Sequence, residues 1–212
     1  MAILYGGING PFSGKVGAVV GYKWKNKSVM RGLPSAKKVR RPSPLQIQQH
    51  AKFRLMNAFL IPLTKFLNIT YNNFAVDMSG YNKAFSFNVK NAIGGIFPDF
   101  MIDFPMVLVS RGDLPNVLSA NVSSLTAESL KFSWTDNSGK GKAKSTDMAF
   151  AAVYNEENGQ WSYKMNLSAR NAGECIMDLS SFKAKVVHSY FGFISADGKE
   201  ITDSIYTGLV NL

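Results

Sequence analysis

The chain has 212 residues, with 24 lysines and arginines against 14 aspartates and glutamates, which gives a formal net charge of +10. Its hydrophobic fraction of 46% excludes a disordered chain, and its length allows one domain of ordinary size or two small ones. One cysteine excludes an intramolecular disulfide and a cysteine-based zinc cluster, and two histidines leave few ways to build a metal site. We therefore expect no metal and no cofactor.

The N-terminus shows no targeting signal. Its first apolar run ends at Tyr5, before two glycines, and no basic cluster precedes that run. No window approaches the ~18 apolar residues that a membrane span needs. We expect a cytoplasmic protein without a transmembrane segment, while incorporation into a particle or export by a signal-less route stays open.

The positive charge is concentrated in the first third of the chain. Residues 1–76 contain 12 of the basic residues and no acidic one, because Asp77 is the first carboxylate. Residues 77–212 contain the other 12 basic residues and all 14 acidic ones. This asymmetry favours a polyanionic or acidic partner for the first third, and the alternative is a basic surface that is merely solvated.

Glycines punctuate the first 32 residues, which favours turns over long helices. The apolar run Val16–Gly21 leads into Tyr22–Lys25, where aromatic residues and lysines alternate. This pattern predicts a strand with aromatics on one face and lysines on the other, and a hairpin turn at Asn26-Lys27 into Ser28–Arg31.

The first third therefore holds the candidate binding site. Tyr22 and Trp24 could stack on bases while lysines contact phosphates, or they could form the buried face of a small sheet. The stretch Leu33–Pro44, with three prolines, is either a basic arm or a solvated connector. The predicted partner or polyanion contacts are Lys15, Lys23, Lys25, Lys27, Arg31, Lys37, Lys38, Arg40 and Arg41.

A helix is predicted over residues 44–60. Ser43 fits the N-cap, Pro44 the first helical position, and Gln46 completes a capping box. The helix stops near Pro62, and a second short helix follows through Phe66-Leu67. The apolar stripe of the first helix is predicted at Ile47, Ala51, Leu55, Ala58 and Phe59.

The middle of the chain gives a pattern that allows two interpretations. Tyr81–Ile93 is either a helix or a strand through Phe85–Val89, and Gly94-Gly95 ends it in both cases. A loop is expected over Phe97–Pro105, followed by a short strand over Met106–Ser110.

From about residue 115 the pattern changes to short strands separated by turns. Seven strands are predicted, and Asp197-Gly198 marks a hairpin between the last two. The predicted strands are Ala120–Leu125, Ser129–Thr135, Met148–Tyr154, Gln160–Asn166, Glu174–Leu179, Val186–Ser195 and Ile201–Val210. This spacing is typical of an antiparallel β-sandwich.

Two runs in this region, Leu130–Trp134 and Tyr190–Ala196, resemble core strands of fibronectin type III and immunoglobulin-like domains. The resemblance covers roughly residues 115–212 and implies a sandwich, a fold that hosts many binding and scaffolding functions. The predicted fold class is mainly β with some α. It comprises a basic, glycine-rich arm with a β-hairpin (1–42), a helical region (43–105) and a fibronectin type III-like sandwich (106–212).

The whole chain also resembles a family of uncharacterised proteins that is common in the Bacteroidota. This resemblance implies no activity and no functional residues. The stretches that carry it are Phe12–Gly17, Val29–Arg31, Ala51–Phe53, Leu108–Gly112, Ser133–Gly139 and Ser195–Lys199.

No catalytic constellation is apparent, and we expect no enzyme and no small-molecule substrate. Cys175 is predicted to be a small buried hydrophobe, His188 to face a sheet surface, and His50 to have no catalytic or metal role. The favoured function is a structural or assembly protein whose basic N-terminal region docks on a partner subunit or polyanion. The alternative is a nucleic-acid-binding protein that uses residues 15–54, and a third reading is a carbohydrate-binding module or enzyme using Trp161 and Tyr163.

Overall fold

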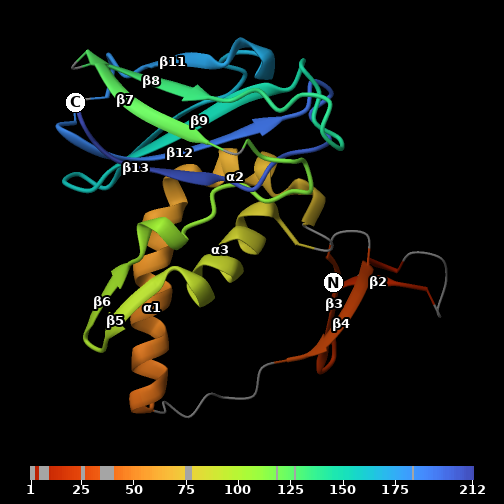
Figure 1. The fold of residues 1–212 in the computed structure, drawn as a ribbon. Helices are drawn as coiled ribbons and strands as arrows, with labels where there is room; N and C mark the ends of the chain where they lie inside the picture. Colours follow the sequence, from red (N-terminus) through yellow and green to blue (C-terminus); the bar gives the residue numbers. More distant parts are fainter. Residues whose placement is uncertain are drawn as a thin grey trace. The chain divides into compact units, whose positions relative to one another are not determined.

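The computed structural model describes residues 3–4, 10–24, 27–33, 41–74, 78–117, 119–126, 128–182 and 184–212. The chain divides into two compact units, residues 1–43 and residues 44–212, which are described separately (Figure 1). Four of the predicted partner contacts, Lys25, Lys37, Lys38 and Arg40, lie outside the described residues.

The first unit is an antiparallel sheet in the order β1-β2-β3-β4. Its strands are β1 (Ile3–Leu4), β2 (Phe12–Val16), β3 (Val19–Trp24) and β4 (Lys27–Gly32). The predicted hairpin is present, but Lys27, predicted to lie in the turn, is the first residue of β4 and pairs with Trp24. The predicted run Val16–Gly21 is not one strand: the chain turns at Gly17, whose φ of 56° suits glycine, and the two halves pair with each other.

The second unit begins with helices. They are α1 (Pro44–Leu60), the 3₁₀ turn η1 (Ile61–Leu63), α2 (Thr64–Thr70), η2 (Asn72–Phe74) and α3 (Gly80–Asn91). The predicted bounds of the first helix are confirmed, and so is the helical alternative for the region after Tyr81. Ser79 caps α3 by accepting a hydrogen bond from the backbone N–H of Asn82 at 3.2 Å.

The predicted apolar stripe of α1 is only partly right. Its member Phe59 is buried, whereas Ile47 and Ala58 are exposed. The other buried residues are Met56 and Leu60, which the predicted stripe left out. The three buried residues all lie in the last turns of the helix. Only that end of α1 meets the rest of the unit's core, so a stripe drawn along the full length cannot be buried.

The region predicted as a loop over Phe97–Pro105 contains the second strand of a hairpin. Strands β5 (Ile93–Ile96) and β6 (Asp99–Ile102) pair with each other, and the turn η3 (Phe104–Met106) follows. The strand predicted over Met106–Ser110 is also wrong. The backbone there bonds to side chains instead of a neighbouring strand: Leu108 N–H donates to Asn88 Oδ1 at 2.9 Å, and Val109 N–H to Ser204 Oγ at 2.9 Å.

All seven strands predicted for the C-terminal region are present, and they form two antiparallel sheets in the orders β11-β8-β7 and β10-β9-β12-β13. The last one starts later than predicted, because Ile201 makes only an isolated bridge to Ile194. The strands are β7 (Ala120–Thr126), β8 (Ser129–Trp134), β9 (Met148–Asn155), β10 (Gln160–Lys164), β11 (Glu174–Asp178), β12 (Val186–Ile194) and β13 (Ile205–Asn211). A 3₁₀ turn, η4 (Arg170–Ala172), precedes β11.

The four-stranded sheet has a core on each of its faces. One face packs on the three-stranded sheet, with Phe132, Trp134 and Phe191 among the buried residues. The other face is covered by the helices and η3, with Phe59 and Phe150 buried between them (Figure 1). Because the sheet has a core on both faces, β9 and β12 are buried along almost their whole length, whereas buried and half-buried residues alternate in β8.

Candidate functional site

The pairing register of the N-terminal sheet decides which side chains share a face. Opposed residues in antiparallel strands point to the same side, and neighbours along a strand point to opposite sides. Val20 pairs with both Lys15 and Arg31, Tyr22 pairs with Val29, and Trp24 pairs with Lys27. These residues therefore share one side of the sheet. We call it the basic-aromatic face; it comprises Lys15, Val20, Tyr22, Trp24, Lys27, Val29 and Arg31.

The basic-aromatic face presents its rings and cations to solvent. Tyr22 and Trp24 are 37% and 51% exposed, which does not fit the interpretation that they are a buried core face. The guanidinium carbon of Arg31 lies 5.6 Å from the centroid of the Tyr22 ring, a cation–π distance. Lys15 and Lys27 are also exposed, so five polar or aromatic groups line one accessible surface.

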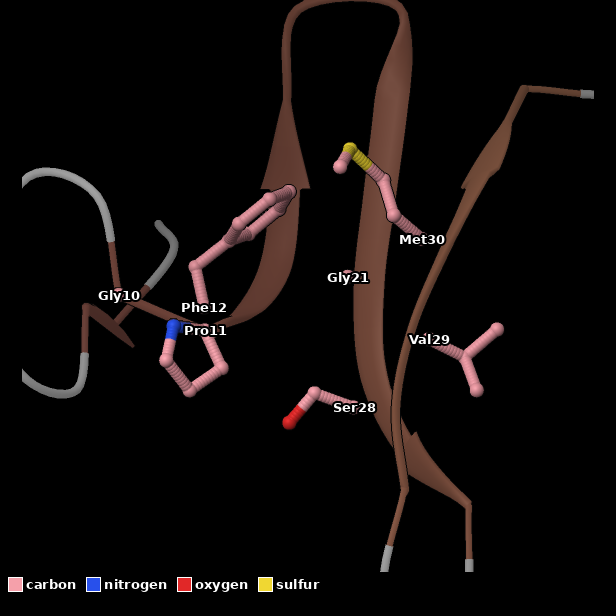
Figure 2. Close-up of a pocket in the computed structure, with 7 residues that line it drawn as sticks. All are labelled: Gly10, Pro11, Phe12, Gly21, Ser28, Val29 and Met30. Atoms are coloured by element: carbon pink, nitrogen blue, oxygen red, sulfur yellow. The ribbon is translucent and has the colours of Figure 1, made fainter.

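The opposite face of the same sheet is built differently. Figure 2 shows Phe12 and Met30 on one side of Gly21, with Val29 pointing away from them. A Cβ on Gly21 would meet two ring carbons of Phe12 at 2.7 Å, so glycine is required where this ring crosses the strand. The open pocket there has a volume of about 370 Å³ and offers no cation, because its lining is Gly10, Pro11, Phe12, Gly21, Ser28, Val29 and Met30.

The residues predicted to contact a partner therefore do not all lie on one face of the sheet. Lys15, Lys27 and Arg31 lie together with the two aromatic residues. Lys23, which pairs with Ser28, lies on the opposite face, and Arg41 is exposed just before α1, outside the sheet. The prediction that Lys23 faces away from Tyr22 and Trp24 is confirmed by this register. The pairing of β3 with β4 brings Lys27 and Arg31 to the aromatic side, and the predicted hairpin was the signal that could have shown this.

The described residues of the second unit do not form a comparable cluster of exposed cations and rings or of reactive groups. Cys175 is buried, and burial raises the pKa of its thiol to about 12, so it is a poor nucleophile, as the prediction of a small buried hydrophobe implies. Within the described ranges, no three His, Cys, Asp or Glu side chains gather closely enough to hold a metal ion. In the same part of the chain, no helix is both long and apolar enough to cross a bilayer.

The two aromatics considered for carbohydrate binding are not available as an exposed platform. Trp161 is half-buried against the helices and donates its indole N–H to the Phe59 carbonyl at 2.8 Å. Tyr163 packs against Phe66, with ring centroids 5.0 Å apart. Both residues belong to the core between the four-stranded sheet and the helical layer, so the expectation of exposed aromatics was wrong.

The two histidines of the chain occupy ordinary structural positions. His188 stacks on Phe104, with ring centroids 3.6 Å apart, and its Nδ1 lies 2.9 Å from the Tyr206 hydroxyl. Burial lowers its pKa, and the nearby Glu156 carboxylate opposes that shift. His50 is exposed on α1.

Comparison with known proteins identifies a family but no activity. No curated protein matches this sequence. A solved fn3 domain of the human collagen alpha-1(XX) chain gives a weak likeness, with a TM-score of 0.32 and 12% identity over 43% of this chain and 79% of that one. The sequence profile of DUF6266 matches residues 11–208. Because that match spans nearly the whole chain, the protein belongs to DUF6266, a family of unknown function.

Proposed function

We propose that this chain is a non-enzymatic assembly protein whose N-terminal sheet docks on an acidic partner surface through the basic-aromatic face. The observation that carries the proposal is the grouping of Lys15, Lys27 and Arg31 around two exposed aromatic rings. Residues 1–76 contribute no carboxylate of their own, because Asp77 is the first acidic residue of the chain. Charge of one sign on an accessible face attracts a surface of the opposite sign.

The exposure of side chains in the N-terminal sheet also supports docking on a partner. Among its described residues only Gly21 is buried, and the large aromatic side chains Tyr22 and Trp24 of the basic-aromatic face are exposed. A small sheet needs a hydrophobic face packed on something to be stable. A partner that covers one face would supply that burial as well as the opposite charge.

A second candidate function, binding of single-stranded nucleic acid, is favoured by the exposure of Tyr22 and Trp24. Aromatic rings beside cations can stack on bases while the cations contact phosphates, and stacking contributes about 1–3 kcal/mol per base. Each phosphate contact would also add to the salt dependence of binding. The two candidates share a surface but predict different bound material.

The test is size-exclusion chromatography with light scattering, with the 260/280 absorbance ratio recorded at low and high salt. A large species free of nucleic acid supports assembly. A monomer that carries nucleic acid, removable by salt, supports the second candidate and overturns the first. A monomer free of nucleic acid at both salt concentrations contradicts both.

Two single variants then show which face of the N-terminal sheet makes the contact. Arg31→Glu and Lys23→Glu change the net charge equally and lie on opposite faces of the same sheet. Docking through the basic-aromatic face predicts that Arg31→Glu reduces the mass of the assembly and that Lys23→Glu does not. Equal effects of both variants would show that net charge, and not this face, governs association.

A further inference from the structure

The N-terminal half of α1 extends beyond the sandwich (Figure 1). The buried residues of α1 all lie in its C-terminal half. Leu45, Gln49 and Phe53 are spaced so that they lie on the same side of the helix as Met56 and Leu60. Met56 and Leu60 are buried in the core, whereas Leu45 and Phe53 are 73% and 50% exposed. One apolar side of the helix is therefore covered at its C-terminal end and open to solvent at its N-terminal end.

A groove runs between this open half of α1 and the neighbouring helix α3. The rings of Phe53 and Phe85 lie 5.2 Å apart between centroids, and with Val89 they form the apolar part of the lining. The groove has a volume of about 600 Å³. We call it the α1–α3 groove; its polar lining is Gln49, Lys52, Ser86 and Lys90.

The charge of the α1–α3 groove has one sign. Each helix contributes one lysine to the lining, Lys52 from α1 and Lys90 from α3. The Lys52 ammonium lies 4.9 Å from the centroid of the Phe100 ring. None of the three α-helices contains an aspartate or glutamate, so the helical layer adds cations and no carboxylates around the groove. Such a surface favours an anionic ligand.

The positive charge and the apolar side chains of the groove indicate what kind of ligand it binds. A second copy of this chain offers helices without a carboxylate, so two grooves would meet with like charges. A small anion would pair with the lysines but would leave Leu45 and Phe53 uncovered. A helix with an apolar stripe flanked by carboxylates satisfies both requirements, because helix-in-groove binding places apolar anchors in the groove and charges at its rim.

We propose that the α1–α3 groove binds an acidic amphipathic helix of a partner protein. The site lies in the unit of residues 44–212 and does not rest on the function proposed for the N-terminal sheet.

The probe is a fluorescently labelled peptide of about 16 residues, which spans roughly 24 Å as a helix. Leucines at spacings of three and four form its apolar side, and glutamates flank them. A matched peptide carries lysine at every glutamate position. Anisotropy is measured with the full chain carrying Lys27→Glu and Arg31→Glu, so that the basic-aromatic face does not capture the acidic probe. The peptide assay therefore tests the proposal for the α1–α3 groove alone, and the proposal for the N-terminal sheet is tested by the chromatography experiment.

The acidic peptide should bind at least about tenfold more tightly than the lysine peptide. Lys52→Glu should remove that preference, whereas Arg54→Glu, an exposed position on the other side of α1, should leave it unchanged. Phe53→Ala should weaken binding without a change of charge. If Phe53→Ala fails to fold, as judged by circular dichroism, the Lys52 and Arg54 pair still decides the question.

Three results would overturn the proposal. The first is equal affinity for the two peptides, and the second is an equal effect of Lys52→Glu and Arg54→Glu. The third is a concentration-dependent dimer that Phe53→Ala abolishes, which would make a second copy of the chain the occupant of the groove.

Discussion

Arg170 and Asp147 form an ion pair that is inaccessible to bulk solvent. Arg170 Nε lies 3.2 Å from Asp147 Oδ2, and both side chains are fully buried. Arg170 also donates to Asn137 Oδ1 at 2.7 Å and stands over the Phe193 ring at 4.2 Å. Its own carbonyl accepts the indole N–H of Trp134 at 2.7 Å. The pair thus joins the loops at one end of the sandwich to its core.

Asp147→Asn should destabilise the unit strongly, because it leaves the buried guanidinium without its countercharge. The expected loss in the free energy of unfolding is about 3–5 kcal/mol. Urea denaturation monitored by tryptophan fluorescence measures it. The double variant Asp147→Leu/Arg170→Met is the control: it removes both charges and should lose less stability than the sum of the losses of the single variants Asp147→Leu and Arg170→Met. Strict additivity would contradict a coupled pair.

The Cys175 thiol should be unreactive in the folded protein. Its pKa of about 12 keeps it protonated at pH 8, and its side chain is buried between the two sheets. Ellman's reagent should therefore label it only after denaturation. Rapid labelling of the native protein at pH 8 would mean that β11 opens readily or that the thiol is more acidic than its surroundings imply.

The stability of the sandwich should decrease as the pH falls below 6.5. Burial lowers the pKa of His188 in the folded state from its ordinary value of 6.5, so the unfolded chain takes up its proton first. Stability is therefore full above pH 6.5 and is lost as the pH falls through the lower folded pKa. Thermal melts at a series of pH values test this. The His188→Gln variant should lose that component, and His50→Gln, on the exposed side of α1, should keep it.

Gly21→Ala should weaken the N-terminal sheet, because the new methyl group would collide with the backbone carbonyl and the ring of Phe12. Overpacking of this kind costs about 1–3 kcal/mol. Hydrogen exchange of the β2 and β3 amides should become faster. Gly32→Ala provides the control, since a Cβ at that position meets no atom within 4 Å. Unchanged exchange in the Gly21 variant would show that Phe12 moves aside without cost.

Much of the fold could be predicted from local signals in the sequence. The Ser43-Pro44 start and the break at Pro62 define α1, and turn residues separate the seven strands of the sandwich. What failed depended on tertiary contacts. The burial of α1 is set by the core that covers only its last turns, and the stretch Phe97–Pro105, predicted as a loop, contains strand β6 of a hairpin.

The candidate site was predicted in composition but not in geometry. The residues of the basic-aromatic face were named from their types, yet Lys23 was grouped with cations that lie on the other side of the sheet. The α1–α3 groove gave no sequence signal, because Phe53 and Phe85 are far apart in the chain and become neighbours only through helix packing.

The two cores that meet at the four-stranded sheet restrict how this chain can vary. In β9, Ala149 and Ala151 face the sandwich while Phe150 and Tyr154 face the helices, so no position along the strand is left to water. Mutational tolerance should have a period of two in β8 and should be low without interruption through β9 and β12. Relatives can therefore exchange loops and surface charge freely, but a change in these two strands requires a matching change in whichever layer packs against it.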